Sequence, residues 1–231
     1  MSQIFQIAID GPVAAGKGTV SRLVAERLGF LYVDTGAMYR VAALLATRNQ
    51  VDWQAEAQIV QLLAQTKLEL RLPTENEKDG RLITVILNGE DVSWAIRTEE
   101  MSMGTSAVSQ HKRVREVLVY KQQEIAAVQN VVMEGRDITY RVLPQAQIKI
   151  YLTGSDVVRA KRRHLQLLTK GQDLSYEQVL AELQRRDEQD KNRVHDPLQI
   201  VSEAWVIDTS DLEIEKVVEM IVERAKSLQS H

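Results

Sequence analysis

The 231-residue sequence contains no cysteine, which excludes disulfide bonds, thiolate nucleophiles and zinc sites built on cysteine. Its formal net charge is −3, so it has no general electrostatic attraction for nucleic acid or for an anionic membrane. It has no apolar run long enough to cross a bilayer, and no basic-then-apolar leader or internal repeat. We therefore expect a cytoplasmic protein that binds neither nucleic acid nor membrane, with any anion site formed by a local cluster of charges.

A phosphate-binding motif lies close to the N-terminus. Residues 4–9 form an apolar run typical of a buried strand, and apolar residues recur at helical spacing over residues 17–28. Glycines between them let the backbone point N–H groups at a phosphate, the start of the helix adds its positive dipole end, and a lysine reaches the outer phosphates. Strand, glycine-rich loop and helix together predict a P-loop. The residues expected to bind a nucleotide phosphate are Gly11, Pro12, Val13, Ala14, Ala15, Gly16, Lys17, Gly18 and Thr19.

The order of residues at the end of this loop is informative. Gly18 directly follows Lys17, where the common P-loop has serine or threonine, and Thr19 comes one position later. The order Gly-Lys-Gly-Thr resembles nucleoside-monophosphate kinases rather than GTPases or motor ATPases. It predicts that Thr19 contacts Mg²⁺ through water and not directly.

Strands alternate with helices along most of the chain, which predicts an α/β fold of the P-loop type, with a parallel sheet and helices on both faces. Residues 67–100 differ, because 68–72 alternates with period two, 82–87 reads as a partner strand, and Asn88-Gly89 marks a turn. These residues predict a small antiparallel β insert (67–100) inside an otherwise α/β chain, and residues 103–106 are expected to form a loop.

Charged residues follow several of the expected strands. Asp34 and Glu134 come directly after apolar runs, and Asp137 follows three residues after Glu134. The carboxyl ends of parallel strands meet at one edge of a sheet. Asp34 and Glu134 could hold Mg²⁺ through water. Asp10 lies just before the loop and could instead accept hydrogen bonds from backbone amides.

Arginines are grouped as a phosphoryl-transfer enzyme requires, since positioned cations must neutralise the charge of two anionic substrates. Arg40 and Arg136 lie at element ends. Arg159, Arg162 and Arg163 fall at i, i+3 and i+4, so one helix face presents three cations. A later helix, expected at 175–190, places Arg186 and Asp190 on one face, and Arg193 shares that face if the helix continues to it.

Taken together, these residues resemble the bacterial-type cytidylate kinases, nearly from end to end. The runs that carry the resemblance are Ile9–Pro12 with Gly16–Thr19, Asp34–Arg40, Gly89–Ser93 with Ile96–Thr98, Arg113–Glu116, Gly135–Asp137, and Arg185–Asp187 with Asp190–Arg193. Two positions depart from the family pattern. Glu134 replaces the usual aspartate, and Ile138-Thr139-Tyr140 replaces an apolar residue followed by Gly-Thr.

The resemblance implies transfer of the γ-phosphoryl group of ATP, with Mg²⁺, to CMP or dCMP, by a monomer. It implies one kinase unit with a core (1–66, 101–154 and 173–231), a monophosphate-binding region that contains the β insert (67–100), and a mobile helical lid (155–172). It implies that Thr35, Arg40 and Arg136 grip the acceptor phosphate and that Ser106, Arg115 and Asp137 read the cytosine. It also implies that Arg186 and Asp190 hold the sugar, that Arg193 bridges phosphate and base, and that the lid residues Arg159 and Arg163 close on the donor phosphates. The implied catalytic residues are Lys17, Arg136, Arg159 and Arg163.

Two other functions are consistent with the P-loop itself. A P-loop kinase of another small acceptor, such as UMP or a non-nucleotide metabolite, would be separated by a panel of acceptors. A non-enzymatic nucleotide-binding switch would bind ATP tightly and transfer nothing. The arginine-rich lid favours an enzyme, because a switch has less need to neutralise two phosphates at once.

Overall fold

The computed structural model describes residues 4–77, 79–169 and 171–229. The expected core, insert and lid ranges therefore include a few positions outside the described residues, at 1–3, 78, 170 and 230–231. The central element is a five-stranded sheet in the order β2-β6-β1-β7-β8, and every pair of neighbours is parallel. Its strands are β1 (Gln6–Asp10), β2 (Leu31–Asp34), β6 (Val131–Gly135), β7 (Ile148–Thr153) and β8 (Trp205–Asp208).

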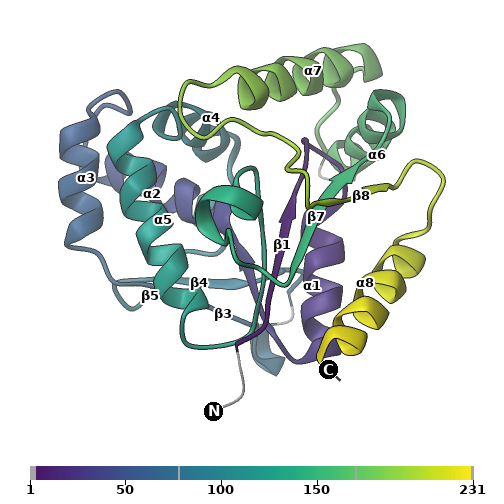
Figure 1. Ribbon diagram of the computed structural model, residues 1–231. Helices are drawn as coiled ribbons and strands as arrows, with labels where there is room; N and C mark the ends of the chain where they lie inside the picture. The colour runs from purple at the N-terminus through teal and green to yellow at the C-terminus, as the bar shows by residue number, and fades with distance from the viewer. Residues whose placement is uncertain (1–3, 78, 170, 230–231) are drawn as a thin grey trace.

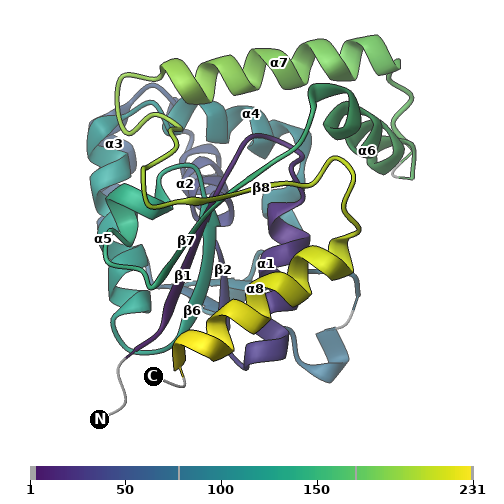
Figure 2. The same cartoon turned by 45° about the vertical axis from the view of Figure 1, so that its right-hand side comes forward.

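Helices cover both faces of this sheet and its upper edge (Figures 1 and 2). Helices α1 and α8 pack on one face, α5 lies on the other, and α6 and α7 lie together above the carboxyl ends of the strands. The helices are α1 (Lys17–Leu28), α2 (Thr35–Arg48), α3 (Glu56–Ala64), α4 (Glu99–Val108), α5 (Lys112–Ala126), α6 (Asp156–Leu168), α7 (Tyr176–Asn192) and α8 (Ile214–Gln229). The predicted α/β fold is confirmed.

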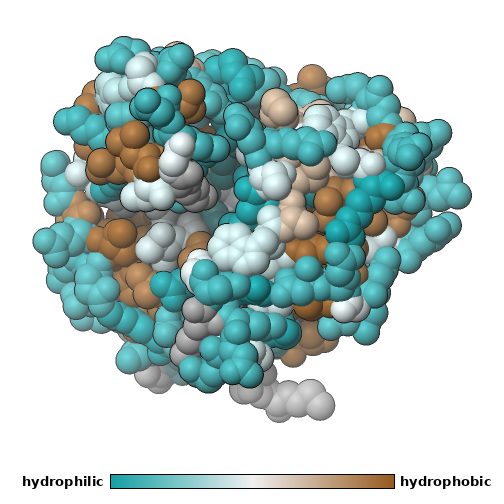
Figure 3. All heavy atoms as spheres, turned by 180° about the vertical axis from the view of Figure 1, so that it is seen from behind, coloured by the Kyte–Doolittle hydropathy of each residue, from teal (hydrophilic) through white to brown (hydrophobic). Residues whose placement is uncertain are grey.

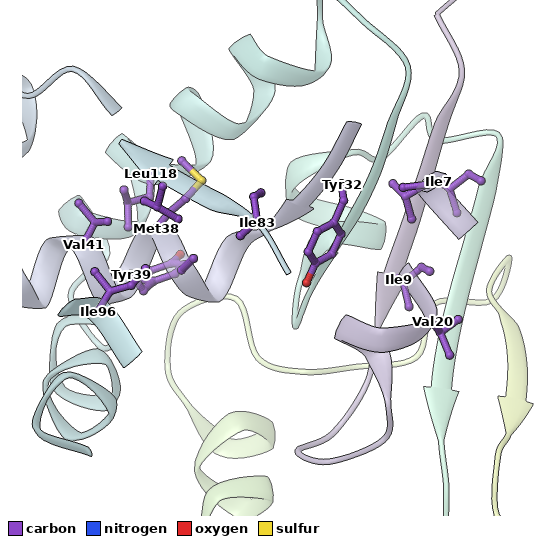
Figure 4. Close-up of a cluster of buried hydrophobic side chains, with 14 of the residues drawn as sticks. Ile7, Ile9, Val20, Tyr32, Met38, Tyr39, Val41, Ile83, Ile96 and Leu118 are labelled. Carbon is purple, nitrogen blue, oxygen red and sulfur yellow. The ribbon is translucent and has the colours of Figure 1, made fainter. Parts of the chain in front are cut away.

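The period-two pattern of β1 explains this layering. Ile7 pairs in register with Val132 and Ile148, and these side chains lie on the face that α1 and α8 cover. Ala8 pairs with Met133 and faces the second core cluster, beneath α5. Figure 4 shows the first cluster continuing from β1 across to α2 and the insert. Both faces are buried, so the strands read as continuous apolar runs.

The predicted insert is present as a separate antiparallel sheet. Strands β3 (Leu68–Arg71), β4 (Thr84–Leu87) and β5 (Glu90–Asp91) lie in the order β3-β4-β5. Asn88 and Gly89 both have positive φ, of 50° and 88°, as the predicted tight turn between β4 and β5 requires. Short 3₁₀ turns lie at Glu75–Glu77 (η1) and Ala95–Arg97 (η2).

The prediction of a loop at residues 103–106 is wrong, because these residues lie inside helix α4. The Thr98 side chain accepts a hydrogen bond from the Met101 amide and caps the helix, and Glu99 and Glu100 lie in its first turn. Gly104 in the helix interior is required by packing. A Cβ there would lie 2.8 Å from Ala43 of α2 and 2.8 Å from the Trp53 ring. Packing against α2 therefore outweighs the low helix propensity of glycine.

Other local predictions are confirmed. Gly29 ends α1 with φ of 68°, as expected of a left-handed C-cap residue. Ser155 caps α6. Ser175 caps α7 in a reciprocal capping box with Gln178. The lid range therefore contains one amphipathic helix, α6, held at a defined start.

Candidate active site

The P-loop connects the carboxyl end of β1 to the start of α1. Gly16 has φ of 87° and stands at the N-cap of α1, where no side chain of the described residues makes a capping hydrogen bond. The first N–H groups of the helix therefore remain open to an anion. The Lys17 side chain is buried, and its Nζ donates to the Pro12 carbonyl oxygen over 2.8 Å, which holds it across the loop.

Asp10 fixes the position of the loop relative to β6. Its carboxylate accepts hydrogen bonds from the Ile138 and Thr139 amides, over 2.9 and 2.8 Å, and from the Thr139 hydroxyl over 2.7 Å. This confirms its expected role toward backbone amides. Burial raises the pKa of Asp10 to about 6. The residues held are those that depart from the family pattern, and they form one π-helical turn, η3 (Ile138–Val142), directly after Asp137.

A cavity of about 620 Å³ opens above the P-loop and joins most of the predicted residues. It lies at the carboxyl edge of the sheet, as expected for an open α/β fold. Predicted residues that line it are Ala14, Ala15, Gly16, Lys17, Gly18, Thr19, Asp34, Thr35, Arg40, Ser106, Arg115, Glu134, Arg136, Asp137, Arg163, Arg186, Asp190 and Arg193. Gly11, Pro12, Val13 and Arg159 do not line it.

One corner of the cavity is rich in arginine. Arg136 donates to Asp190 of α7 over 2.5 Å, and Arg40 contacts the Ser102 hydroxyl of α4 over 3.2 Å. Burial lowers the pKa of Arg40 and of Arg186, and neighbouring arginines lower both further. Such crowding of guanidinium groups is unfavourable without a counter-charge, so this corner suits a phosphate group.

A second corner is a buried cluster of alternating charges. Arg115 of α5 has a side chain only 2% exposed, and it donates to Asp137 over 2.5 Å. The guanidinium carbon of Arg115 lies 5.4 Å from the centre of the Tyr39 ring. Arg193 lies 3.4 Å from the other oxygen of Asp137. Donors and acceptors held rigidly in this way can read the edge of a planar base.

Two carboxylates beside the loop fit a hydrated Mg²⁺. Asp34 and Glu134 are paired in register on β2 and β6. A Cβ added at Gly18 would lie 3.3 Å from Glu134, which places that carboxylate against the start of α1. Burial raises the pKa of Glu134, and the negative charge of Asp34 raises it further, so a cation there would relieve both effects. Among the described residues, no group of three His, Asp or Glu side chains is arranged to hold a metal ion.

The three arginines of α6 do not act as one cationic face. Arg159 is buried, and it binds Asp156 and Asp187 over 2.5 and 2.6 Å and the Val13 carbonyl oxygen over 2.8 Å. Arg162 donates to the backbone and hydroxyl oxygens of Thr209, and Arg163 donates to Gln166. Arg162 and Arg163 line the cavity whereas Arg159 does not, so Arg159 can contact donor phosphates only if α6 moves.

Sequence reasoning missed two carboxylates that hold the site together. Asp187 accepts from the Val13 amide over 3.0 Å and from Arg159, and so links α7 to the P-loop. Asp196 accepts from Arg115 over 2.9 Å. Asp187 lies in the run Arg185–Asp187, which is part of the family resemblance, so that resemblance could have identified it as a site residue. No motif marks Asp196, because its partner is 81 residues away.

Phosphate binding should be accompanied by proton uptake at Lys17. Burial lowers the pKa of the Lys17 ammonium below its ordinary value of 10.5, and the positive charge of Arg136 lowers it further. A phosphate beside Nζ favours the charged form, so ATP binding raises this pKa. The protein therefore takes up protons at pH values between the pKa of Lys17 without ATP and its pKa with ATP bound. We expect uptake approaching one proton per site at about pH 8.5, measured by calorimetry of MgATP binding in two buffers with different ionisation enthalpies.

The matched control is Lys17→Arg, whose guanidinium stays charged throughout this range and should take up no proton. Equal uptake by the two proteins would assign the proton to another group.

The family model and the curated relatives that match this sequence all belong to one family. A sequence model of the family described as "Cytidylate kinase" matches residues 7–227. The cytidylate kinase of Caldicellulosiruptor bescii is 45% identical over 217 residues, covering 94% of this chain and 93% of that protein. The cytidylate kinase of Bacillus subtilis is 43% identical over 223 residues, covering 96% and 97%. A crystal structure of an uncharacterized protein from Eubacterium ventriosum covers 97% of this chain and 99% of its own, with a TM-score of 0.53 at 12% identity, which is a similarity of fold alone.

Proposed function

Because the chain belongs to the cytidylate kinase family, we propose that it transfers the γ-phosphoryl group of ATP to CMP and dCMP, giving ADP and CDP or dCDP. The shape of the site supports this proposal independently of the family. A single cavity brings the P-loop, an arginine-rich corner and a buried charged cluster together, which matches a donor phosphate, an acceptor phosphate and a base.

The transfer needs positioning more than covalent chemistry. A phosphate oxygen of the acceptor attacks the γ-phosphorus of ATP, the bond from that phosphorus to the β–γ bridging oxygen breaks, and ADP leaves. The open N–H groups at the start of α1 bind the donor phosphates. Lys17 stabilises the charge that develops on the bridging oxygen, and Arg136, between the P-loop and Asp190, contacts both phosphates.

The acceptor is bound by residues of four helices and of the segment that follows β6. Thr35 at the start of α2, Arg40 one turn later and Arg136 after β6 hold its phosphate, and Thr35 is oriented by donating to the Glu134 carbonyl oxygen over 2.8 Å. Arg186 and Asp190 of α7 hold the sugar. The base lies against Ser106, Arg115 and Asp137, with Arg193 between base and phosphate.

On the donor side, α6 acts as a lid over the P-loop. Arg163 already lines the cavity and closes on the donor phosphates, while Arg159 reaches them if the lid movement frees it from Asp187. Closure excludes water, which would otherwise hydrolyse ATP. Thr19, Asp34 and Glu134 would hold Mg²⁺ through water, and the ion would supply positive charge beside the donor phosphates.

The proposal includes that the protein acts on small molecules, as a monomer, in the cytoplasm. No helix of the described residues is both long and apolar enough to span a membrane. The face seen from behind is largely hydrophilic, with hydrophobic residues in separate groups (Figure 3). The ligands are nucleotides, and no nucleic acid is required.

Phosphorus NMR of a mixture of ATP, CMP and Mg²⁺ tests the transfer directly. We expect ADP and CDP to form in equal amounts without inorganic phosphate. ADP and inorganic phosphate without CDP would show hydrolysis and would contradict the proposal.

Asp190→Ala should impair use of the acceptor far more than use of ATP. The substitution removes a sugar ligand and leaves Arg136 without its partner at 2.5 Å. We expect the KM for CMP to rise roughly 10- to 100-fold, as for a lost hydrogen bond to a charged group, with the KM for ATP little changed. Steady-state kinetics with each substrate varied in turn measures both values.

Glu188→Ala is the matched control, since Glu188 lies on the same helix and its side chain is 66% exposed. Equal increases in both KM values for Asp190→Ala, with the fold intact, would remove Asp190 from the sugar site.

A further inference from the structure

The segment that follows α7 carries a strained residue behind the base corner of the cavity. Asp196 has φ of 48°, in the left-handed region that few residues other than glycine, asparagine and aspartate adopt. Such a conformation costs free energy and persists only where surrounding contacts impose it. It therefore calls for an explanation in terms of what Asp196 holds.

Three hydrogen bonds impose this conformation. Arg193 Nε donates to the Asp196 carbonyl oxygen over 2.6 Å, and the Leu198 amide donates to the Asp190 carbonyl oxygen over 2.8 Å. The Tyr140 hydroxyl of η3 donates to the Pro197 carbonyl oxygen over 2.6 Å. The segment is thus tied at one end to α7 and at the other to the turn that follows Asp137.

The carboxylate of Asp196 points at the back of Arg115. Its Oδ2 lies 2.9 Å from Arg115 Nε, and its Oδ1 lies 3.5 Å from Nε of the half-exposed Arg141. Asp196 itself does not line the cavity, whereas Arg115 and Asp137 do. It therefore acts on a bound base only through Arg115.

The two carboxylate oxygens of Asp137 therefore have different partners. One oxygen of Asp137 accepts from Arg115 Nη2 over 2.5 Å, and the other lies 3.4 Å from Arg193 Nη2, which is longer than a normal hydrogen bond. Asp196 accepts from Nε of Arg115 over 2.9 Å, and the more distant Ser109 carbonyl oxygen accepts from Nη1 over 3.4 Å, so the guanidinium does not turn both of its N–H edges to Asp137. The second oxygen of Asp137 keeps its capacity to accept a further hydrogen bond.

We infer that Asp196 is a specificity-determining positioning residue that holds Arg115 away from the second oxygen of Asp137, leaving that oxygen to accept from the exocyclic amine of cytosine. The inference rests on the proposed function. Cytosine presents an amine donor at C4, whereas uracil presents a carbonyl acceptor there. An available carboxylate oxygen favours the first and repels the second, so Asp196 sets the preference for CMP over UMP.

Asp196→Asn tests this with the backbone preserved, since asparagine tolerates the left-handed conformation. Loss of the negative charge lets Arg115 turn toward Asp137. We expect the ratio of kcat/KM for CMP to that for UMP to fall roughly ten-fold, with the KM for ATP unchanged. Asp196→Gly, which also allows this φ and removes the side chain, should lower the ratio further. A purely structural role would reduce both acceptors alike and leave the ratio unchanged, which would overturn the inference.

Tyr140→Phe provides an independent test from outside the ion cluster. It removes the hydroxyl that holds Pro197, so Asp196 becomes less firmly placed, and we expect a smaller fall of the same ratio. Asp211→Asn, an exposed aspartate on the loop after β8, is the control for loss of one negative charge and should leave the ratio at the wild-type value. An unchanged ratio in Tyr140→Phe and both Asp196 variants would overturn the inference even if CMP is a good substrate. Absence of CMP turnover by the wild-type protein would instead contradict the proposed function.

Discussion

Lys17→Ala is expected to lower turnover of CMP by roughly 10²- to 10³-fold or more, the cost of removing one positioned charge donor from a phosphoryl-transfer site. The ammonium is buried at the mouth of the P-loop, with Nζ 2.8 Å from the Pro12 carbonyl oxygen, and the described residues that line the cavity include no other lysine. Without it, charge developing on the bridging oxygen loses its nearest cation. Single-turnover formation of CDP at saturating ATP measures the effect on the chemical step.

Lys112→Ala is the control, because Lys112 begins α5 and its side chain is 66% exposed. Thermal unfolding of both variants shows whether the fold is retained. Turnover of Lys17→Ala close to that of the wild type would contradict the P-loop assignment.

Gly11→Ala should destabilise the whole core more than any other glycine substitution in the loop. A Cβ at Gly11 would lie 2.0 Å from the Leu152 carbonyl oxygen, an atom of the backbone of β7. Since β1 and β7 are hydrogen-bonded neighbours, the clash can be relieved only by separating the two strands. We expect the free energy of unfolding to fall by about 3 kcal/mol or more, measured by urea denaturation.

Gly29→Ala is the matched control, because Gly29 has φ of 68° and an added Cβ there would meet nothing within 4 Å. Only the conformational cost applies, about 1 kcal/mol. Equal losses for the two variants would mean that the approach of β7 to Gly11 is not what fixes the loop.

Much of the fold follows from local pattern. The apolar runs at β1, β2, β6 and β7 are buried on both faces, so their composition alone marks them, and the capping serines at 155 and 175 mark helix starts. Helix α4 was missed because Gly104 and the serine and threonine residues around it have turn-like propensities, which packing on α2 overrides. Strand β5 is only two residues long and has no pattern of its own.

In the candidate site too, some residues could be predicted from local sequence and others could not. The P-loop and Arg136 could be predicted because each follows a strand that the sequence marks, and Arg40 because it lies near the start of α2. The partners of these residues could not. Arg159 was expected to face the donor phosphates, yet it is held by Asp187, 28 residues further along the chain. Arg115 is held by Asp196 from a segment without a motif. Such pairings are set by how α7 and its following loop fold back over the sheet, and no local spacing encodes them.

The proposed transfer to CMP and dCMP is tested by ADP release from MgATP by the purified protein with CMP, dCMP, UMP, AMP, GMP or no acceptor. We predict fast release with CMP and dCMP, much slower release with UMP, and background release with the purine nucleotides and without acceptor. Fast release with another acceptor would identify a different kinase. Tight ATP binding with slow release throughout would identify a nucleotide-binding switch and would contradict the proposed transfer.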